Sequence, residues 1–128
     1  MNGSFQTDLM VNDVTHSDFL VTKIGEDLYR LEEHPIMSEE LNYKDVIEAK
    51  FENEKLIFQK LYQKSDLKHF NYLFSKENYN SKKFENLLKQ IDESDGYWTQ
   101  AFGGCLFVSL PKDSKFNLYE KVQELFKK

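Results

Sequence analysis

The sequence predicts an α+β fold, with N-terminal antiparallel strands and hairpins followed by a β-α-β-α unit whose helices pack on one face of a mixed sheet. Three observations support this prediction. Apolar residues recur with a period of two in the first half and with the helical period of about 3.6 in the second. Strands followed by alternating strands and helices are typical of α+β proteins. No internal repeat or linker-like stretch interrupts the chain, and 128 residues suit a single domain over residues 1–128.

The first part of the chain predicts a strand and then a hairpin. Residues 5–11 alternate between apolar and polar side chains, as in a half-buried strand, and residues 12–17 are expected to form a turn or short loop. Residues 18–24 and 28–33 flank a short polar tip that contains glycine, which is the pattern of a hairpin. Pro35 is expected to end this ladder because proline has no amide donor.

A second hairpin and a further strand follow. Residues 46–51 and 56–62 are rich in β-branched and aromatic side chains, and they surround the polar tip at residues 52–55. In residues 69–75, aromatic side chains occupy every second position, which predicts another strand.

The helical period begins after residue 80. Asn80 or Ser81 is expected to cap a helix that ends near Asp95-Gly96, where glycine is a suitable left-handed C-terminal residue. The apolar residues of this helix form one stripe at positions i, i+3, i+4 and i+7: Phe84, Leu87, Leu88 and Ile91.

The last elements are a strand and a helix. Residues 105–110 predict a buried strand, and Gly103-Gly104 before it is expected to serve a close backbone approach or a bulge. Asn117, with Glu120 three residues later, resembles the start of a helix that continues to the C-terminus. The connection from residue 70 to residue 110 is long enough for a right-handed parallel crossover.

The net charge of −5 conceals a segregation of charge along the chain. Residues 26–54 hold ten acidic and three basic residues, a balance of −7, and residues 55–89 hold eight lysines against three acids, a balance of +5. Two interpretations are open: ordinary solvated faces, or a surface that steers a partner electrostatically. Arg30 is the only arginine beside sixteen lysines. Nucleic-acid recognition usually relies on the arginine fork, so we expect no nucleic-acid partner.

The composition excludes several other classes of protein. One cysteine excludes a disulfide scaffold, and a 15% aromatic content is too high for a disordered acidic tail. No apolar run has the roughly 20 residues that a membrane span needs, and residues 1–10 lack the features of a signal peptide. We therefore expect a cytoplasmic protein that does not bind a membrane.

No motif of catalysis, metal binding or cofactor binding is present. The three histidines are isolated from one another, and Cys105 begins an apolar strand with no basic neighbour that would lower its pKa. Gly103-Gly104 lacks the spacing of a phosphate loop. Adjacent acids such as Glu32-Glu33 point to opposite faces of a strand and so rarely form an acid–base pair. We expect no enzyme activity, no cofactor and no metal site.

A protein-binding surface is the remaining functional prediction. The acidic segment would complement a basic partner, and aromatic side chains near it would act as anchors. Tyr97, Trp98 and Phe102 form either a recognition patch or a plug between helix and sheet. The candidate partner-binding residues are Glu32, Glu33, Glu39, Glu40, Asp45, Tyr29, Tyr43 and Trp98.

A pattern of spacings resembles an uncharacterised family of small bacterial domains, the 4265-like domains of unknown function. The pattern comprises Tyr29-Arg30-Leu31, Pro35, residues 45–49 (DVIEA), the second hairpin as far as Ser65, and residues 106–111 (LFVSLP). The family has a glycine where this chain has Lys44. It has no established catalytic residues, so the resemblance implies none here.

The overall profile is similar to that of bacterial immunity proteins, which bind and block a toxin in the cytosol of the producing cell. Our first hypothesis is therefore a protein-binding inhibitor of this kind, with a cognate toxin as the partner. The alternative is a small-ligand or peptide-binding regulatory module. In that case a barrel-like first half would hold a pocket lined by Tyr29, Phe58, Tyr62 and Phe70. The oligomeric state is not predicted by the sequence.

Overall fold

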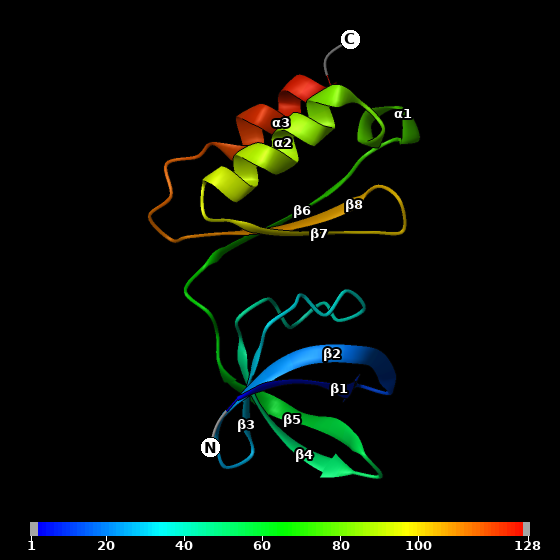
Figure 1. Ribbon diagram of the computed structural model, residues 1–128, viewed down its shortest axis with the longest axis vertical. Coiled ribbons are helices and arrows are strands. Elements are labelled where there is room, and N and C mark those ends of the chain that lie inside the picture. Colours follow the sequence, from blue (N-terminus) through cyan, green and yellow to red (C-terminus); the bar gives the residue numbers. More distant parts are fainter. Residues whose placement is uncertain (1–2, 127–128) are drawn as a thin grey trace. The chain divides into compact units, whose positions relative to one another are not determined.

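A computed structural model describes residues 3–126 of the chain (Figure 1). The chain forms two compact units, Met1–Ser65 and Asp66–Lys128, and each unit has its own hydrophobic core. Antiparallel strands come first and the helices follow, so the predicted α+β class is confirmed. That residues 1–128 behave as a single domain stays a prediction.

The first unit is a closed five-stranded barrel. Its strands are β1 (Ser4–Val11), β2 (Val14–Gly25), β3 (Leu28–Leu31), β4 (Val46–Glu52) and β5 (Lys55–Gln63). Consecutive strands pair antiparallel, whereas β1 and β5 pair in parallel. The parallel closure follows from the strand number, because the fifth strand of such a meander runs in the same direction as the first.

Tight turns join two of the strand pairs. Asn12-Asp13 and Asn53-Glu54 all have positive φ, from 49° to 69°, as the two central residues of a type I′ hairpin turn require. The prediction of a loop at residues 12–17 is therefore wrong, because the turn has only two residues and β2 begins at Val14. Asn and Asp tolerate the left-handed conformation, which allows so short a turn.

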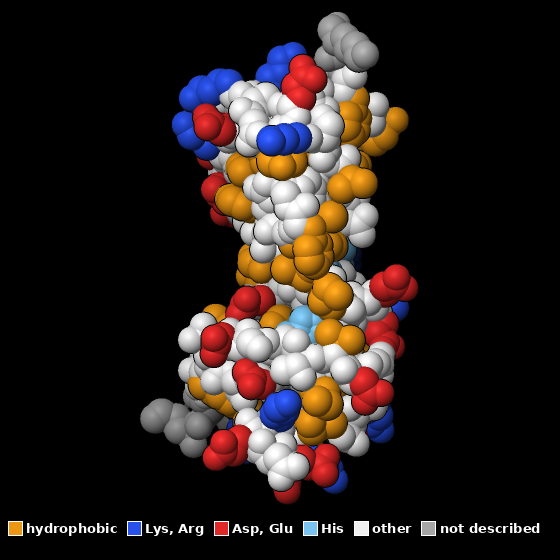
Figure 2. Space-filling model, turned by 90° about the vertical axis from the view of Figure 1, so that its right-hand side faces the viewer, with side chains coloured by type: hydrophobic (Ala, Val, Ile, Leu, Met, Phe, Trp, Pro, Cys, Tyr) orange, Lys and Arg blue, Asp and Glu red, His pale blue; other side chains and the backbone are white. Residues whose placement is uncertain are grey.

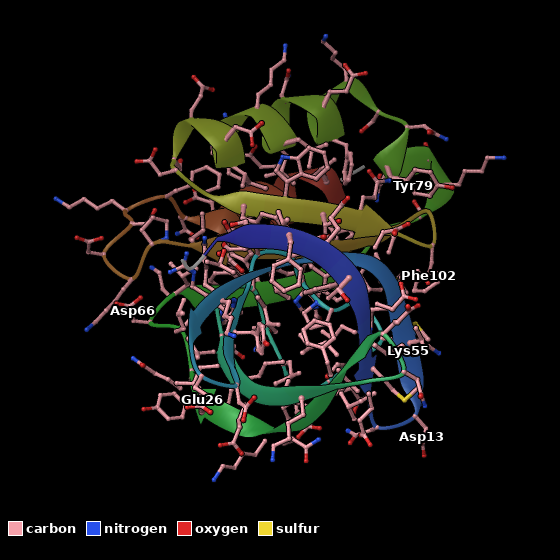
Figure 3. All side chains as sticks on the ribbon, turned by 60° about the horizontal axis from the view of Figure 1, so that its bottom comes forward. Asp13, Glu26, Lys55, Asp66, Tyr79 and Phe102 are labelled. Carbon is pink, nitrogen blue, oxygen red and sulfur yellow. The ribbon has the colours of Figure 1, made fainter. Side chains whose placement is uncertain are left out.

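Side chains fill the inside of the barrel (Figure 3). Every strand contributes inward-facing residues that alternate with outward-facing ones. The residues with no exposed surface are Leu9, Val21, Leu31, Ile47, Ala49 and Leu56. The barrel interior is therefore a packed core, as expected for a small barrel.

The second unit places helices on a three-stranded sheet. Its elements are β6 (Lys68–Leu73), α1 (Lys76–Tyr79), α2 (Lys82–Glu93), β7 (Tyr97–Ala101), β8 (Cys105–Leu110) and α3 (Leu118–Phe126). The strand order is β6-β8-β7, and α2 and α3 lie on one face of this sheet (Figure 1). The predicted caps are confirmed: Ser81 Oγ accepts from Phe84 N at 3.2 Å, and Asn117 Oδ1 accepts from Glu120 N at 3.0 Å.

The predicted parallel crossover between residues 70 and 110 is wrong in its end point. Both β6 and β7 pair antiparallel with β8, so β6 and β7 are parallel to each other and β8 lies between them. The crossover through α2 therefore leads to β7, a strand that the sequence does not predict. The sheet under the helices is antiparallel, and the parallel pairing belongs to the barrel.

Candidate functional site

The connection between β3 and β4 differs from the other barrel turns. It comprises residues 32–45, whereas β1–β2, β2–β3 and β4–β5 are joined by two residues each. Its ends are held together, because Leu31 N donates to Asp45 O and Lys44 N donates to Leu31 O, both at 2.8 Å. A compact loop whose ends meet is an Ω-loop, a type that is frequently functional. We call residues 32–45 the Ω-loop.

Glu32 fastens the start of the Ω-loop. Its carboxylate accepts from Thr22 Oγ1 at 2.5 Å and from Arg30 Nε at 2.9 Å, and it also forms an ion pair with Lys44. The Glu32 side chain is only 9% exposed. Burial by itself would raise the pKa of Glu32, but the hydrogen bonds from Lys44, Thr22 and Arg30 outweigh burial and lower it.

Two further acids, Asp45 and Glu33, fix the Ω-loop by hydrogen bonds. Asp45 is 2% exposed, and its carboxylate accepts from Asn42 N and from Ser65 N, both at 2.8 Å. Glu33 accepts from Leu20 N of β2 at 2.6 Å. These hydrogen bonds connect the loop to β2 and to the end of the barrel unit. Together with Glu32, these two residues account for three of the five acidic residues of the loop.

The other two acids lie on the exposed part of the Ω-loop, residues 36–40, which we call the crest. Pro35 and Leu41 are buried on either side of it. Met37 N donates to His16 Nε2 at 3.3 Å, and Asn12 Nδ2 donates to Glu40 Oε1 at 2.7 Å. The crest is thus tied to β2 and to the β1–β2 turn, and it presents Glu39 and Glu40 to solvent.

A cavity of about 290 Å³ lies between the crest and the β1–β2 turn. Ser38 Oγ and His16 Nδ1 are buried without a hydrogen-bond partner among the described residues; of these two residues, only Ser38 lines the cavity. We call this space the crest cavity. It is lined by Val11, Asn12, Met37, Ser38, Glu39 and Glu40.

The structure separates the eight candidate residues into groups. Glu39 and Glu40 lie side by side and exposed on the crest, and Tyr43, half-buried, lies under the Lys44 ammonium at 5.2 Å from its ring centre. The other acids, Glu32, Glu33 and Asp45, are engaged in fastening the loop.

The prediction that Tyr29 and Trp98 act as anchors near the acidic segment is wrong. Tyr29 is 3% exposed in the barrel core, and burial and the nearby Asp27 charge raise its pKa. Trp98 belongs to the second unit, where it packs against the helix-covered core and donates from Nε1 to Asp92 Oδ1 at 3.1 Å. Trp98 is therefore part of the plug between helix and sheet. Neither ring is available as an anchor on the Ω-loop.

Sequence reasoning missed Asn12, His16, Met37 and Ser38. None belongs to a motif: Met37 and Ser38 lie in the crest itself, and the fold brings Asn12 and His16 to it. One signal was present in the sequence. Residues 34–45 lack both the strand and the helix period between two predicted strands, and long connections of this kind are often functional.

The acidic charge of the chain belongs to the first unit. Residues 1–65 hold thirteen acidic and seven basic residues, a net charge of −6, and residues 66–128 hold nine and ten, a net charge of +1. Figure 2 shows acidic side chains scattered over the visible face of the first unit. The lysine-rich block at residues 55–89 is divided between the two units.

The four residues expected to line a pocket in the alternative hypothesis lie in different surroundings. Tyr29 lies in the barrel core and Phe58 packs against it, Tyr62 is 58% exposed, and Phe70 packs against the core of the second unit. Within the described residues, no group of three or more His, Cys, Asp or Glu side chains is arranged to hold a metal ion. None of the helices in that part of the chain combines the length and the apolar character of a membrane span.

Comparisons with known proteins give a likeness of fold alone. No family model and no curated protein matches the chain. Among solved structures, a hypothetical protein from Neisseria gonorrhoeae, described as a novel crystal structure, is similar with a TM-score of 0.55 at 15% sequence identity. The match covers 98% of this chain and 87% of that one. At this identity the similarity indicates a shared fold.

Proposed function

We propose that this chain is a protein-binding inhibitor that acts in the cytoplasm, most specifically an immunity protein that neutralises a toxin by direct binding. The observation that supports this proposal is the crest of the Ω-loop. A barrel that otherwise has two-residue turns extends one long loop, fastens it with three acids, and leaves Glu39 and Glu40 exposed.

The crest suits rapid recognition of a basic protein surface. Its position is fixed by hydrogen bonds to Asn12 and His16, so little conformational entropy is lost on binding. The net charge of −6 on the same unit attracts a basic partner and disfavours acidic ones. Met37, 58% exposed, supplies an adaptable apolar contact on the same crest.

A peptide-binding regulatory module is the second candidate, and the crest cavity is the observation that favours it. The cavity of about 290 Å³ lies just below the roughly 300–1,000 Å³ of small-molecule sites. It suits part of a peptide better than a whole cofactor. A regulatory module would bind short basic peptides as tightly as an intact protein, whereas an inhibitor needs the folded partner.

Co-expression with the product of a neighbouring toxin-like gene tests the proposal. We expect the two proteins to co-purify and the cells to survive expression of the toxin. The double substitution Glu39→Lys with Glu40→Lys should weaken the complex at least tenfold and abolish protection. The matched control is Glu26→Lys, an exposed acid at the β2–β3 turn (Figure 3), which should change the affinity less than threefold. Unchanged affinity in the crest variant, or no complex, would overturn the proposal.

A further inference from the structure

His16 joins β2 to the crest through a hydrogen bond that only the neutral imidazole can form. Met37 N donates to His16 Nε2 at 3.3 Å. A backbone amide can only donate, so Nε2 must keep its lone pair and the proton of the neutral ring must be on Nδ1. We infer that His16 is a pH switch: the neutral ring holds the crest at Met37, and the protonated ring releases it.

The barrel fixes the position of the His16 ring. In the β1–β2 pairing, His16 lies opposite Leu9, a core residue with no exposed surface. The ring also meets that of Phe19 edge to face, with 6.1 Å between the ring centres. These contacts hold the imidazole in one orientation, so Nε2 remains the atom that it presents to Met37.

The second ring nitrogen makes this arrangement sensitive to a proton. His16 Nδ1 is buried and has no hydrogen-bond partner in the described part of the chain, and an unsatisfied buried donor is unfavourable. Protonation places a further N–H group on Nε2, so two donors then face each other at Met37 and a charge is buried. Release of the crest removes both penalties, because both N–H groups can then reach water.

The titratable groups on the elements around His16 are mostly acidic. On β1, β2, the turn between them and the crest they are Asp8, Asp13, Asp18, Lys23, Glu39 and Glu40, and the rest of the Ω-loop adds Glu32, Glu33, His34, Tyr43, Lys44 and Asp45. None of the described residues forms an ion pair with His16. The hydrogen bond from Met37 is therefore the polar contact that a change in the charge of His16 disrupts.

Release at Met37 would loosen one of the two hydrogen bonds that fix the crest. The other, from Asn12 Nδ2 to Glu40 Oε1, does not involve His16. A partner that binds the ordered crest would have to restore its order after release, which costs conformational entropy. This consequence rests on the proposed function: acidification should weaken partner binding as His16 becomes charged.

NMR of the full chain between about pH 8 and about pH 5, where imidazoles ordinarily change charge, tests the switch without a partner. The ring C–H signals of His16 report its protonation, and the amide shift and hydrogen-exchange protection factor of Met37 report the hydrogen bond. We expect both to change with one midpoint, and the protection factor to fall at least tenfold. A Met37 amide that does not respond while His16 titrates, or a His16 ring that stays neutral throughout, would overturn the inference.

Substitutions at residue 16 separate the acceptor from the charge. His16→Gln supplies an acceptor oxygen that does not titrate and should remove the pH dependence of the Met37 signals. His16→Phe keeps a ring without an acceptor and should leave Met37 unprotected over the whole range, with the signals of the other strands unchanged. His34→Gln, at the other histidine of the first unit, is the matched control and should retain the pH dependence. If the pH dependence persisted in His16→Gln, the switch would lie elsewhere and the inference would be wrong.

Failure of the switch can be distinguished from failure of the proposed function. In the complex with a toxin, the affinity of the native chain should fall at least tenfold across the His16 midpoint, and that of His16→Gln less than threefold. Absence of a toxin complex would overturn the immunity function, whereas the Met37 measurement would still support the switch. A complex whose crest amide ignores the charge of His16 would support the function and overturn the switch.

Discussion

Glu32 joins three segments of the barrel unit through one carboxylate. Its partners are Thr22 in β2, Arg30 in β3 and Lys44 near the end of the Ω-loop. Glu32→Gln keeps the shape of the side chain and removes its charge. Hydrogen bonds to a charged group are each worth about 1.5–3 kcal/mol, so we expect the free energy of unfolding to fall by about 2 kcal/mol at pH 7, measured by urea denaturation.

The contribution of the Glu32 carboxylate to the free energy of unfolding should decrease as the pH falls. The pKa of Glu32 in the folded chain lies below its ordinary value of 4.5. Its stabilising effect is therefore complete above pH 4.5 and is lost as the pH falls through the lower, folded pKa. The difference in unfolding free energy between the native chain and Glu32→Gln should shrink from pH 7 to pH 3. A difference that stayed constant would show that the charge of Glu32 is not responsible.

Lys44 combines a favourable charge with a strained backbone. Its φ of 71° lies in the left-handed region, which costs a non-glycine residue about 1–2 kcal/mol. Its ammonium nevertheless pairs with Glu32. This is the position at which the resembled family pattern has glycine, and the φ value gives a physical reason for glycine here.

Two substitutions separate the charge of Lys44 from its strain. Lys44→Met loses the ion pair and keeps the strain, whereas Lys44→Gly loses both and gains freedom in the unfolded chain. We expect both variants to be less stable than the native chain, and Lys44→Gly to be about 0.5–1 kcal/mol more stable than Lys44→Met. Thermal unfolding of the two variants provides the comparison. Equal midpoints would show that the backbone at residue 44 is not strained.

At the scale of elements, Gly104 determines how β6 ends against the β7–β8 hairpin. A Cβ atom at residue 104 would lie 2.0 Å from the carbonyl oxygen of Phe74, and Phe74 N donates to Gly104 O at 2.8 Å. The expected close backbone approach at Gly103-Gly104 is therefore confirmed at Gly104. Because the clash is with backbone, Gly104→Ala should cost about 3 kcal/mol, the upper end of the usual range for steric insertions, measured by urea denaturation.

A matched glycine serves as the control for this substitution. A Cβ atom at Gly3 would have nothing within 4 Å, so Gly3→Ala should change stability by no more than about 0.5 kcal/mol. Similar losses in the two variants would show that backbone entropy, rather than the contact with Phe74, decides the effect at residue 104.

Elements with a single clear signal were predictable from the sequence, and elements with a mixed signal were not. The helix α2 was predicted from its apolar stripe, and β4 and β5 from their β-branched and aromatic runs on either side of a polar tip. The structure contains all three. The strand β7 was missed because Tyr97-Trp98-Thr99 has no strict alternation. Its side chains are half-buried on both faces of the sheet.

The candidate site was predictable in composition but not in geometry. The acidic segment identified the Ω-loop, which contains six of the eight candidate residues. Which acids fasten the loop and which remain exposed depends on backbone donors such as Leu20 N and Ser65 N. These donors are distant in sequence and have no side-chain signature. The sequence alone therefore could not show that Glu32 fastens the loop whereas Glu39 remains exposed.

At the scale of the whole molecule, the two units differ in charge and have separate cores. The residues of the barrel core all come from Met1–Ser65, and those of the second core all come from Asp66–Lys128. The net charges are −6 and +1. The partner binding that we propose for the first unit should thus weaken with added salt, because exposed charges are screened over about 10 Å at 0.1 M salt.

Separate cores lead to a prediction about unfolding. Ile47→Ala removes a fully buried side chain of the barrel and should cost about 2–5 kcal/mol. Trp98, the single tryptophan, reports on the second unit. We expect Ile47→Ala to lower the urea midpoint of the β4 amide signals and to leave the midpoint of Trp98 fluorescence unchanged, while Leu106→Ala in β8 has the converse effect. If either variant moves both midpoints together, the two units unfold as one and residues 1–128 form the single cooperative domain that the length of the chain predicts.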